Sequence, residues 1–205
     1  MKRHLLFTIG HSTHAIEHFI GLLDQNDIDV VADVRSTPYS RYNPQFNREE
    51  LQVKLRDAGI SYVFIGKELG ARSEDPSCYR DGRVQYAALA KTTTFKLGIG
   101  RIRKGVESDH RIALMCAEKD PLDCHRTILV ARHLENEGFE IMHILGDGQI
   151  ETQIAATDRL IKQHKLGNGD LFMSREEVSE CAFRKQEERI SYVADDRMFG
   201  SVVES

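Results

Sequence analysis

The sequence lacks the long apolar run that a membrane-spanning helix requires. No apolar stretch approaches the roughly 20 residues needed to cross a bilayer. The opening residues lead directly into a short strand-like segment instead of a signal-peptide core. We therefore expect a cytoplasmic protein that does not bind membranes.

Cysteine is scarce, and neither sign of charge is in large excess. Four cysteines are too few and too scattered for a disulfide scaffold, so we expect free thiols in a reducing compartment. A formal net charge of -4 gives no bulk electrostatic reason to bind phosphate backbones. Nucleic acid stays open as a partner, but the charge does not support it. The cysteines are Cys78, Cys116, Cys124 and Cys181.

Length and composition are typical of one globular domain followed by a tail. The chain has 205 residues, of which 40% are hydrophobic and 29% charged, and it contains no internal repeat or low-complexity segment. Gly167-Asn168-Gly169 predicts a hinge, and Ser174 with Glu177 forms a capping box that begins a helix. We expect an α/β domain over residues 1–166 and a C-terminal helical tail over 167–205.

Apolar runs alternate with helical patterns along the predicted domain. Helices between strands predict an α/β fold with a mostly parallel sheet of about five strands, covered by helices on both faces. The C-terminal helix is an appendage to this fold. Short β-branched runs predict strands at 5–9, 28–34, 60–65, 112–116 and 139–145, whereas helical spacing predicts helices near 15–23, 47–55, 86–106, 124–137 and 150–164.

Chemically active residues gather directly after the predicted strands. Ligands of open α/β sheets bind beyond the carboxyl ends of the strands, so these residues are the candidate site. His11 and Ser12 follow the first strand. The second strand leads into a loop with two prolines, and the fourth leads into the next helix. The second and fourth strands, with the segments that follow them, contribute Asp33, Arg35, Ser36, Ser40, Cys116, Glu118, Cys124, His125 and Arg126.

Cys124 is the best candidate for a reactive thiol. It is predicted to lie at a helix N-terminus beside Arg126, where the helix dipole and the cation both favour the thiolate. The same backbone amides attract an anion. Cys116 ends an apolar strand, a position more typical of a small buried hydrophobe.

Several blocks of the sequence resemble a known family. Thr8–Ser12, Asp33-Val34-Arg35, Gly66–Gly70, Met115–Glu118 and Cys124-His125-Arg126 occur in this order. Together they resemble the family called domain of unknown function 488, over most of residues 5–145. The resemblance supports the fold and the place of the site, but it implies no reaction.

The site residues predict, first, an enzyme that acts on an anionic, phosphate- or nucleotide-like substrate. In this hypothesis Arg35 and Arg126 hold the anion, and His11 or His125 transfers protons. Cys124 is the nucleophile or Glu118 the general acid-base. The remaining polar groups, which would contact the substrate, are Ser12, Asp33, Ser36 and Ser40.

Two alternatives stay open. One is a non-catalytic module that binds a nucleotide or nucleic acid, or senses redox state. The other is a metal site, since Cys116, Glu118, Cys124, His125 and His11 are ligand types. Their spacing fits no common zinc motif, and adjacent Cys124 and His125 are expected to reach one ion with difficulty. We therefore expect no metal and no cofactor, and the sequence indicates no oligomeric state.

Overall fold

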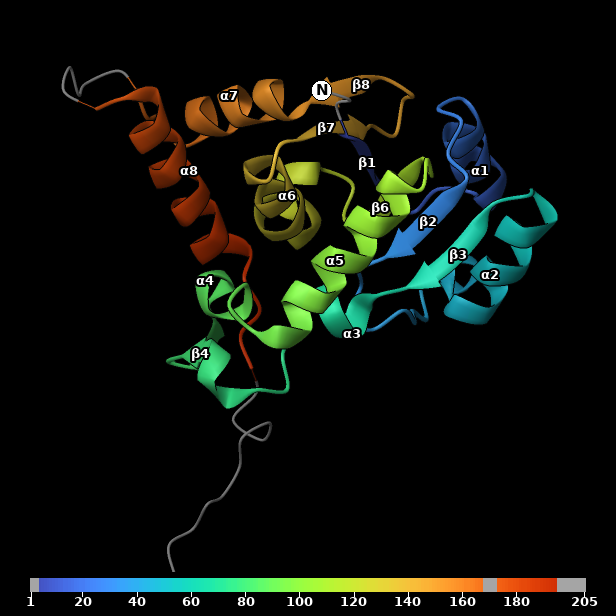
Figure 1. Ribbon diagram of the computed structural model, residues 1–205, viewed down its shortest axis with the longest axis horizontal. Coiled ribbons are helices and arrows are strands. Elements are labelled where there is room, and N and C mark those ends of the chain that lie inside the picture. Colours follow the sequence, from blue (N-terminus) through green and yellow to red (C-terminus); the bar gives the residue numbers. More distant parts are fainter. Residues whose placement is uncertain (1–3, 168–172, 195–205) are drawn as a thin grey trace, which may run out of the picture.

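The central element of the protein is a six-stranded sheet (Figure 1). A computed structural model describes residues 4–167 and 173–194. The strand order is β3-β2-β6-β1-β7-β8, and all neighbours are parallel except β7 and β8. This confirms the predicted mostly parallel α/β sheet. Its strands are β1 (His4–Gly10), β2 (Val30–Asp33), β3 (Ser61–Phe64), β6 (Ile112–Cys116), β7 (Phe139–Ile144) and β8 (Ile150–Thr152).

The antiparallel edge strand β8 lies where the sequence predicts the first turn of a helix. The helix α7 begins only at Gln153 and ends at Gln163. Thr152 is its N-cap, and its hydroxyl accepts a hydrogen bond from the Ala155 N–H at 3.2 Å. The helix prediction was therefore wrong for Ile150–Thr152, because the cap fixes the helix start and leaves the preceding residues free to pair with β7.

Helices cover both faces of the sheet, as predicted. On one face α1 (Ile16–Asp24) and α2 (Arg48–Asp57) pack on a buried apolar layer that includes Val31 and Met115. On the other face α5 (Thr93–Glu107), α6 (Arg132–Asn136) and α7 pack on the alternate residues of the same strands. Figure 1 shows α1 and α2 on one side of the sheet and α5 and α6 on the other.

The helix predicted over residues 86–106 is two helices. α4 (Tyr86–Leu89) ends before Thr92, whose hydroxyl caps α5 by accepting from the Phe95 N–H at 3.1 Å. Gly98 of α5 packs against the short helix α3 (Gly66–Leu69), which the sequence does not predict. A Cβ at position 98 would lie 2.7 Å from the Cβ of Glu68, so the glycine permits this close approach.

The C-terminal helix α8 (Arg175–Ile190) packs on the rest of the chain. It begins with the predicted capping box between Ser174 and Glu177. Its Ala182 and Phe183 are buried in the larger apolar core. The predicted division into residues 1–166 and 167–205 stays a prediction, and Asn168 and Gly169 of the predicted hinge lie outside the described residues.

Short elements complete the described part of the chain. A hairpin lies between β3 and α5, and the Val84 N–H donates to the Tyr192 carbonyl at 2.9 Å, which ties the segment after α8 to it. None of the helices in residues 4–167 and 173–194 is both long and apolar enough to cross a bilayer. The short elements are η1 (Pro44–Phe46), η2 (Pro76–Cys78), β4 (Tyr79–Arg80), β5 (Arg83–Val84), η3 (Pro121–Asp123) and the π-helical η4 (Arg126–Ala131).

The strand order brings the predicted site residues together. β6 lies between β2 and β1, so the ends of three strands from distant parts of the sequence are neighbours. Asp33 of β2 is level with Met115, and Gly10 of β1 is level with Cys116. Because the strands are parallel, all three carboxyl ends open at one edge.

Candidate functional site

The first group of site residues is a buried cluster around Arg35. Its Nε and Nη2 donate to the two carboxylate oxygens of Asp33 at 2.9 and 2.7 Å, and Nη2 also donates to the Phe46 carbonyl at 2.9 Å. Tyr62 donates its hydroxyl to the same carboxylate at 2.7 Å. The guanidinium is therefore paired within the protein, and this pairing weakens the case for Arg35 as an anion clamp.

His11 belongs to the same cluster. Its ring stacks on Phe46 with centroids 4.3 Å apart. Nδ1 lies 2.8 Å from the Ser12 carbonyl and Nε2 lies 3.2 Å from Arg35 Nη1, so Nδ1 carries the proton and Nε2 accepts. Burial, together with the charge of Arg35, lowers the pKa of His11 to about 4. Both ring nitrogens are thus occupied, and the imidazole is neutral near pH 7.

The second group combines two thiols, an imidazole and a carboxyl at the end of β6. Cys124 Sγ donates to Glu118 Oε2 at 2.9 Å. His125 Nδ1 lies 3.8 Å from Cys116 Sγ and 3.9 Å from Cys124 Sγ. The other ring nitrogen of His125 donates to the Val34 carbonyl at 3.0 Å, which directs Nδ1 toward the sulfurs.

Arg126 and Gly10 fix the loop that carries Glu118. Arg126 is almost completely buried, and its Nη1 donates to the Glu118 carbonyl at 2.8 Å. A Cβ on Gly10 would lie 1.9 Å from that carbonyl oxygen, so only glycine allows the loop to cross the end of β1. The sequence predicts Arg126 as a second anion clamp, whereas in the structure its guanidinium supports the backbone.

Burial and close contact shift the acidity of the second group. Burial and the neighbouring Cys124 raise the pKa of the Glu118 carboxyl. Burial alone would also raise the pKa of Cys124, but the contact with the Cys116 thiol and the charge of Arg126 outweigh it and lower that pKa. Burial raises the pKa of the Cys116 thiol. The pKa of Cys124 is therefore shifted in the opposite direction to that of Cys116.

The pKa of His125 in this group also differs from its ordinary value. Burial favours the neutral imidazole, but the hydrogen bond and charge of Cys124 outweigh burial and raise the pKa of His125. A carboxyl and an imidazole that both depart from their ordinary pKa mark this group as a candidate for proton transfer.

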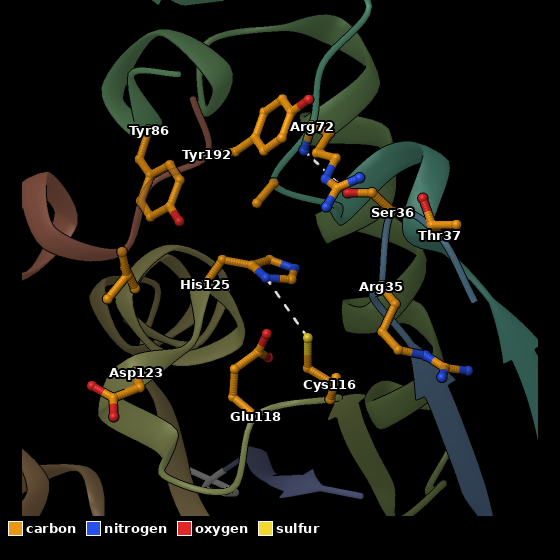
Figure 2. A pocket seen from close by; sticks show the side chains of 13 residues that line it. Arg35, Ser36, Thr37, Arg72, Tyr86, Cys116, Glu118, Asp123, His125 and Tyr192 are labelled. Carbon is orange, nitrogen blue, oxygen red and sulfur yellow. Dashed lines mark hydrogen bonds between the residues drawn. The ribbon is translucent and has the colours of Figure 1, made fainter. Parts of the chain in front are cut away.

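A cavity of about 270 Å³ lies directly over the second group (Figure 2). Cys116, Glu118 and His125 line it, whereas Cys124 is not among its lining residues. Figure 2 shows the guanidinium of Arg35 turned away from His125, although other atoms of Arg35 line the wall. The cavity is therefore lined by Glu118 and His125, whereas the thiol with the lowered pKa is not part of its lining.

Three residues that are not among the predicted site residues form the opposite side of the cavity. Arg72 lies over the ring of Tyr192, with its guanidinium carbon 4.5 Å from the ring centroid, and Tyr86 lines the wall between them and His125. These residues come from the segment after α3, from α4 and from the segment after α8. No motif connects such distant positions, so the sequence offers no signal for them.

The predicted serine contacts have separate places. Ser36 lines the cavity, and its hydroxyl accepts from the Arg72 N–H at 3.1 Å. Ser40 instead holds its own loop, because its hydroxyl accepts from the Tyr42 N–H at 3.1 Å. Ser12 has a left-handed φ of 48° and donates its N–H to the Ala117 carbonyl at 2.9 Å.

Two of the residues considered as metal ligands, Cys124 and His125, lie closer together than the sequence led us to expect. Cys124 and His125 are adjacent in sequence, yet their ligand atoms and the Cys116 sulfur all lie within 4.8 Å of one another. Cys124 is extended (φ -136°, ψ 139°) and His125 is helical (φ -60°, ψ -25°). The chain turns between them, and this turn brings both side chains to one point.

Comparison with known proteins gives one match. A family model described as Domain of unknown function DUF488 matches residues 15–133, which is more than half of the chain. This confirms the resemblance seen in the sequence. Neither the curated proteins nor the solved structures contain a match.

Proposed function

Because this chain belongs to the DUF488 family, whose description states no activity, we propose a function from the geometry of the site. We infer that the protein is an enzyme that acts on a small anionic substrate in the cavity over Cys116. Glu118 is its general acid-base. The observation that carries this proposal is the position of the Glu118 carboxyl, which lines a cavity together with the imidazole of His125.

Glu118 satisfies the requirements of a general acid-base better than the other candidates. Its carboxyl lines the cavity and accepts a hydrogen bond from the Cys124 thiol at 2.9 Å. His11, by contrast, has both ring nitrogens engaged. A group that exchanges its proton during turnover needs a pKa near the working pH, and burial moves Glu118 in that direction.

Arg72 is the cation that favours an anionic substrate. It lines the cavity with Ser36 and Thr37, and its side chain is exposed, unlike those of Arg35 and Arg126. The cation–π contact with Tyr192 restrains the guanidinium of Arg72 beside the cavity. A phosphate-type group is the anion that such a planar fork of donors binds best.

The cavity size limits the substrate. At about 270 Å³ it is slightly smaller than the roughly 300–1,000 Å³ of typical small-molecule sites. Tyr86 and Tyr192 line the cavity with their rings, and Figure 2 shows the hydroxyl of Tyr86 pointing toward His125. A small phosphorylated molecule therefore fits the site better than a polymer.

Calorimetric titration of the full chain with inorganic phosphate and with nucleoside monophosphates tests whether the cavity binds an anion. We expect binding that weakens about tenfold or more in Arg72→Ala, since one charge-assisted contact contributes about 1.5–3 kcal/mol. Arg56→Ala is the matched control, because that arginine is exposed on α2 away from the cavity. Equal affinity of both variants, or no binding by the wild type, contradicts an anion site.

Catalysis needs a separate measurement. The anions that bind are incubated with wild type and with Glu118→Gln, and turnover is followed by mass spectrometry. We expect turnover to fall by about a hundredfold or more in Glu118→Gln while affinity for the anion is kept. If the wild type binds these anions but converts none of them, the protein is a binding module and the proposal of an enzyme is overturned.

A further inference from the structure

The second group contains the parts of a metal site. Cys116 and Cys124 supply two sulfurs, and His125 supplies Nδ1, with all three atoms within 4.8 Å of one another and all three residues buried. We propose that Cys116, Cys124 and His125 bind a zinc-type divalent cation, with its fourth coordination position open to the cavity.

The distances fit coordination. On a tetrahedral zinc ion, with a Zn–S bond of about 2.3 Å and a Zn–N bond of about 2.0 Å, a sulfur and a nitrogen lie about 3.6 Å apart. The two sulfur-to-Nδ1 distances are 3.8 and 3.9 Å. These separations lie near the outer limit of hydrogen bonds to sulfur, and small shifts would bring all three atoms to bonding distance of one ion.

The surroundings of the three groups orient them as ligands. The N–H on Nε2 of His125 donates to the Val34 carbonyl, which leaves the lone pair of Nδ1 directed at the sulfurs. The Arg126 backbone N–H donates to Cys124 Sγ at 3.4 Å, a contact that stabilises a thiolate. A ligand and its supporting partner are thus present for the imidazole and for one sulfur.

Glu118 is a neighbour of the ion, not its fourth ligand. Its Oε2 lies 2.9 Å from Cys124 Sγ, whereas an oxygen and a sulfur on one tetrahedral zinc lie about 3.5 Å apart. Cys116, His125 and Glu118 all line the cavity, so the remaining position faces the space where a ligand enters. Three protein ligands with an open position are the arrangement of catalytic zinc sites. That role of the open position rests on the proposed function, but the three ligands do not.

Titration of the chelator-treated, reduced full chain with Co²⁺ tests the site. We expect about one Co²⁺ per chain, with the visible bands of tetrahedral cobalt and near-ultraviolet bands from sulfur to cobalt. Zn²⁺ should displace it. An absence of sulfur-to-cobalt bands in the wild type overturns the proposal.

Substitutions assign the ligands. Cys116→Ser, Cys124→Ser and His125→Gln should each weaken Co²⁺ binding about tenfold or more and change the spectrum. Cys181→Ser is the matched control, because Cys181 lies on α8 outside the group, and it should leave the spectrum unchanged. Circular dichroism checks the fold of each variant. Folded Cys116 and Cys124 variants that keep the wild-type spectrum contradict the assignment.

The two proposals fail separately. Cobalt coordination without binding of phosphate or nucleoside monophosphate keeps the metal site and removes the anionic substrate. Phosphate binding that depends on Arg72, in a protein that shows no cobalt spectrum, removes the metal site and keeps the anion site.

Discussion

At the scale of single residues, the thiol with the lowered pKa and the side chains that line the cavity are different groups. Cys124 has a lowered pKa but is only 1% exposed, whereas Glu118 and His125 line the cavity. A nucleophilic thiol needs both a thiolate and a path for the substrate. The structure therefore does not favour Cys124 as a nucleophile that a substrate in the cavity reaches directly.

His11 makes the stability of the protein depend on pH. Its pKa is about 4 in the folded chain and 6.5 as the ordinary value. Between these values the unfolded chain binds more protons, so the free energy of unfolding falls as pH falls from 6.5 toward 4. The stabilisation is present in full above pH 6.5.

Urea denaturation at about pH 7 and at about pH 4.5 measures this dependence. Wild type should lose about 2 kcal/mol more between the two pH values than His11→Asn, which keeps a donor for the Ser12 carbonyl but does not titrate. His18→Asn is the control, since the His18 side chain is exposed. Parallel profiles of wild type and His11→Asn would show that His11 is not the titrating group.

At the scale of elements, the contact between α3 and α5 depends on one glycine. Gly98→Ala places a Cβ 2.7 Å from side-chain atoms of Glu68 and Leu69, so we expect a loss of about 1–3 kcal/mol in the free energy of unfolding. Gly100→Ala lies on the same helix, where a Cβ meets nothing within 4 Å, and should stabilise by up to about 1 kcal/mol. Equal effects of the two substitutions in urea denaturation would contradict close packing at Gly98.

Most elements could be predicted from the sequence because their signals are local. The β-branched run before Asp33 and the apolar run before Cys116 both form strands. The edge strand β8 could not be predicted, because its three residues gain their structure only by pairing with β7. The short helix α3 is likewise stabilised by packing on α5 and not by its own sequence.

The candidate site was predictable in position and less so in detail. Parallel strand ends share an edge, so His11, Arg35 and Cys116 were expected to be close. Their partners were not predictable. Asp33 is two residues from Arg35 and pairs with it, which changes an expected substrate contact into internal structure. Tyr192 reaches the cavity only because α8 folds back on the chain.

At the scale of the whole molecule, α8 is part of the larger core. Phe183 is 3% exposed and lies under the guanidinium of Arg132, whose central carbon is 4.3 Å from the centroid of the Phe183 ring. Gln186 donates to the Leu122 carbonyl at 2.8 Å and so ties α8 to the segment before Cys124. The helix therefore supports one wall of the site from outside.

Removal of the Phe183 ring should therefore weaken the whole molecule. Phe183→Ala should reduce the free energy of unfolding by about 3 kcal/mol, as expected for a buried aromatic. Leu97→Ala, at a side chain 63% exposed, should change it by no more than about 0.5 kcal/mol. A loss in Phe183→Ala no larger than in the control, measured by urea denaturation, would show that α8 contributes little.

The position of β6 between β1 and β2 also fixes the order in which the protein can be completed during synthesis. Among the residues that the structure describes, β1 pairs with β6 and β7, and β2 pairs with β3 and β6. A growing chain that has not yet reached Ile112 has no strand that can join its first two, and their inner edges stay unpaired. The two halves of the sheet therefore join only after β6 has been synthesised. Before that point the nascent chain most needs protection from aggregation.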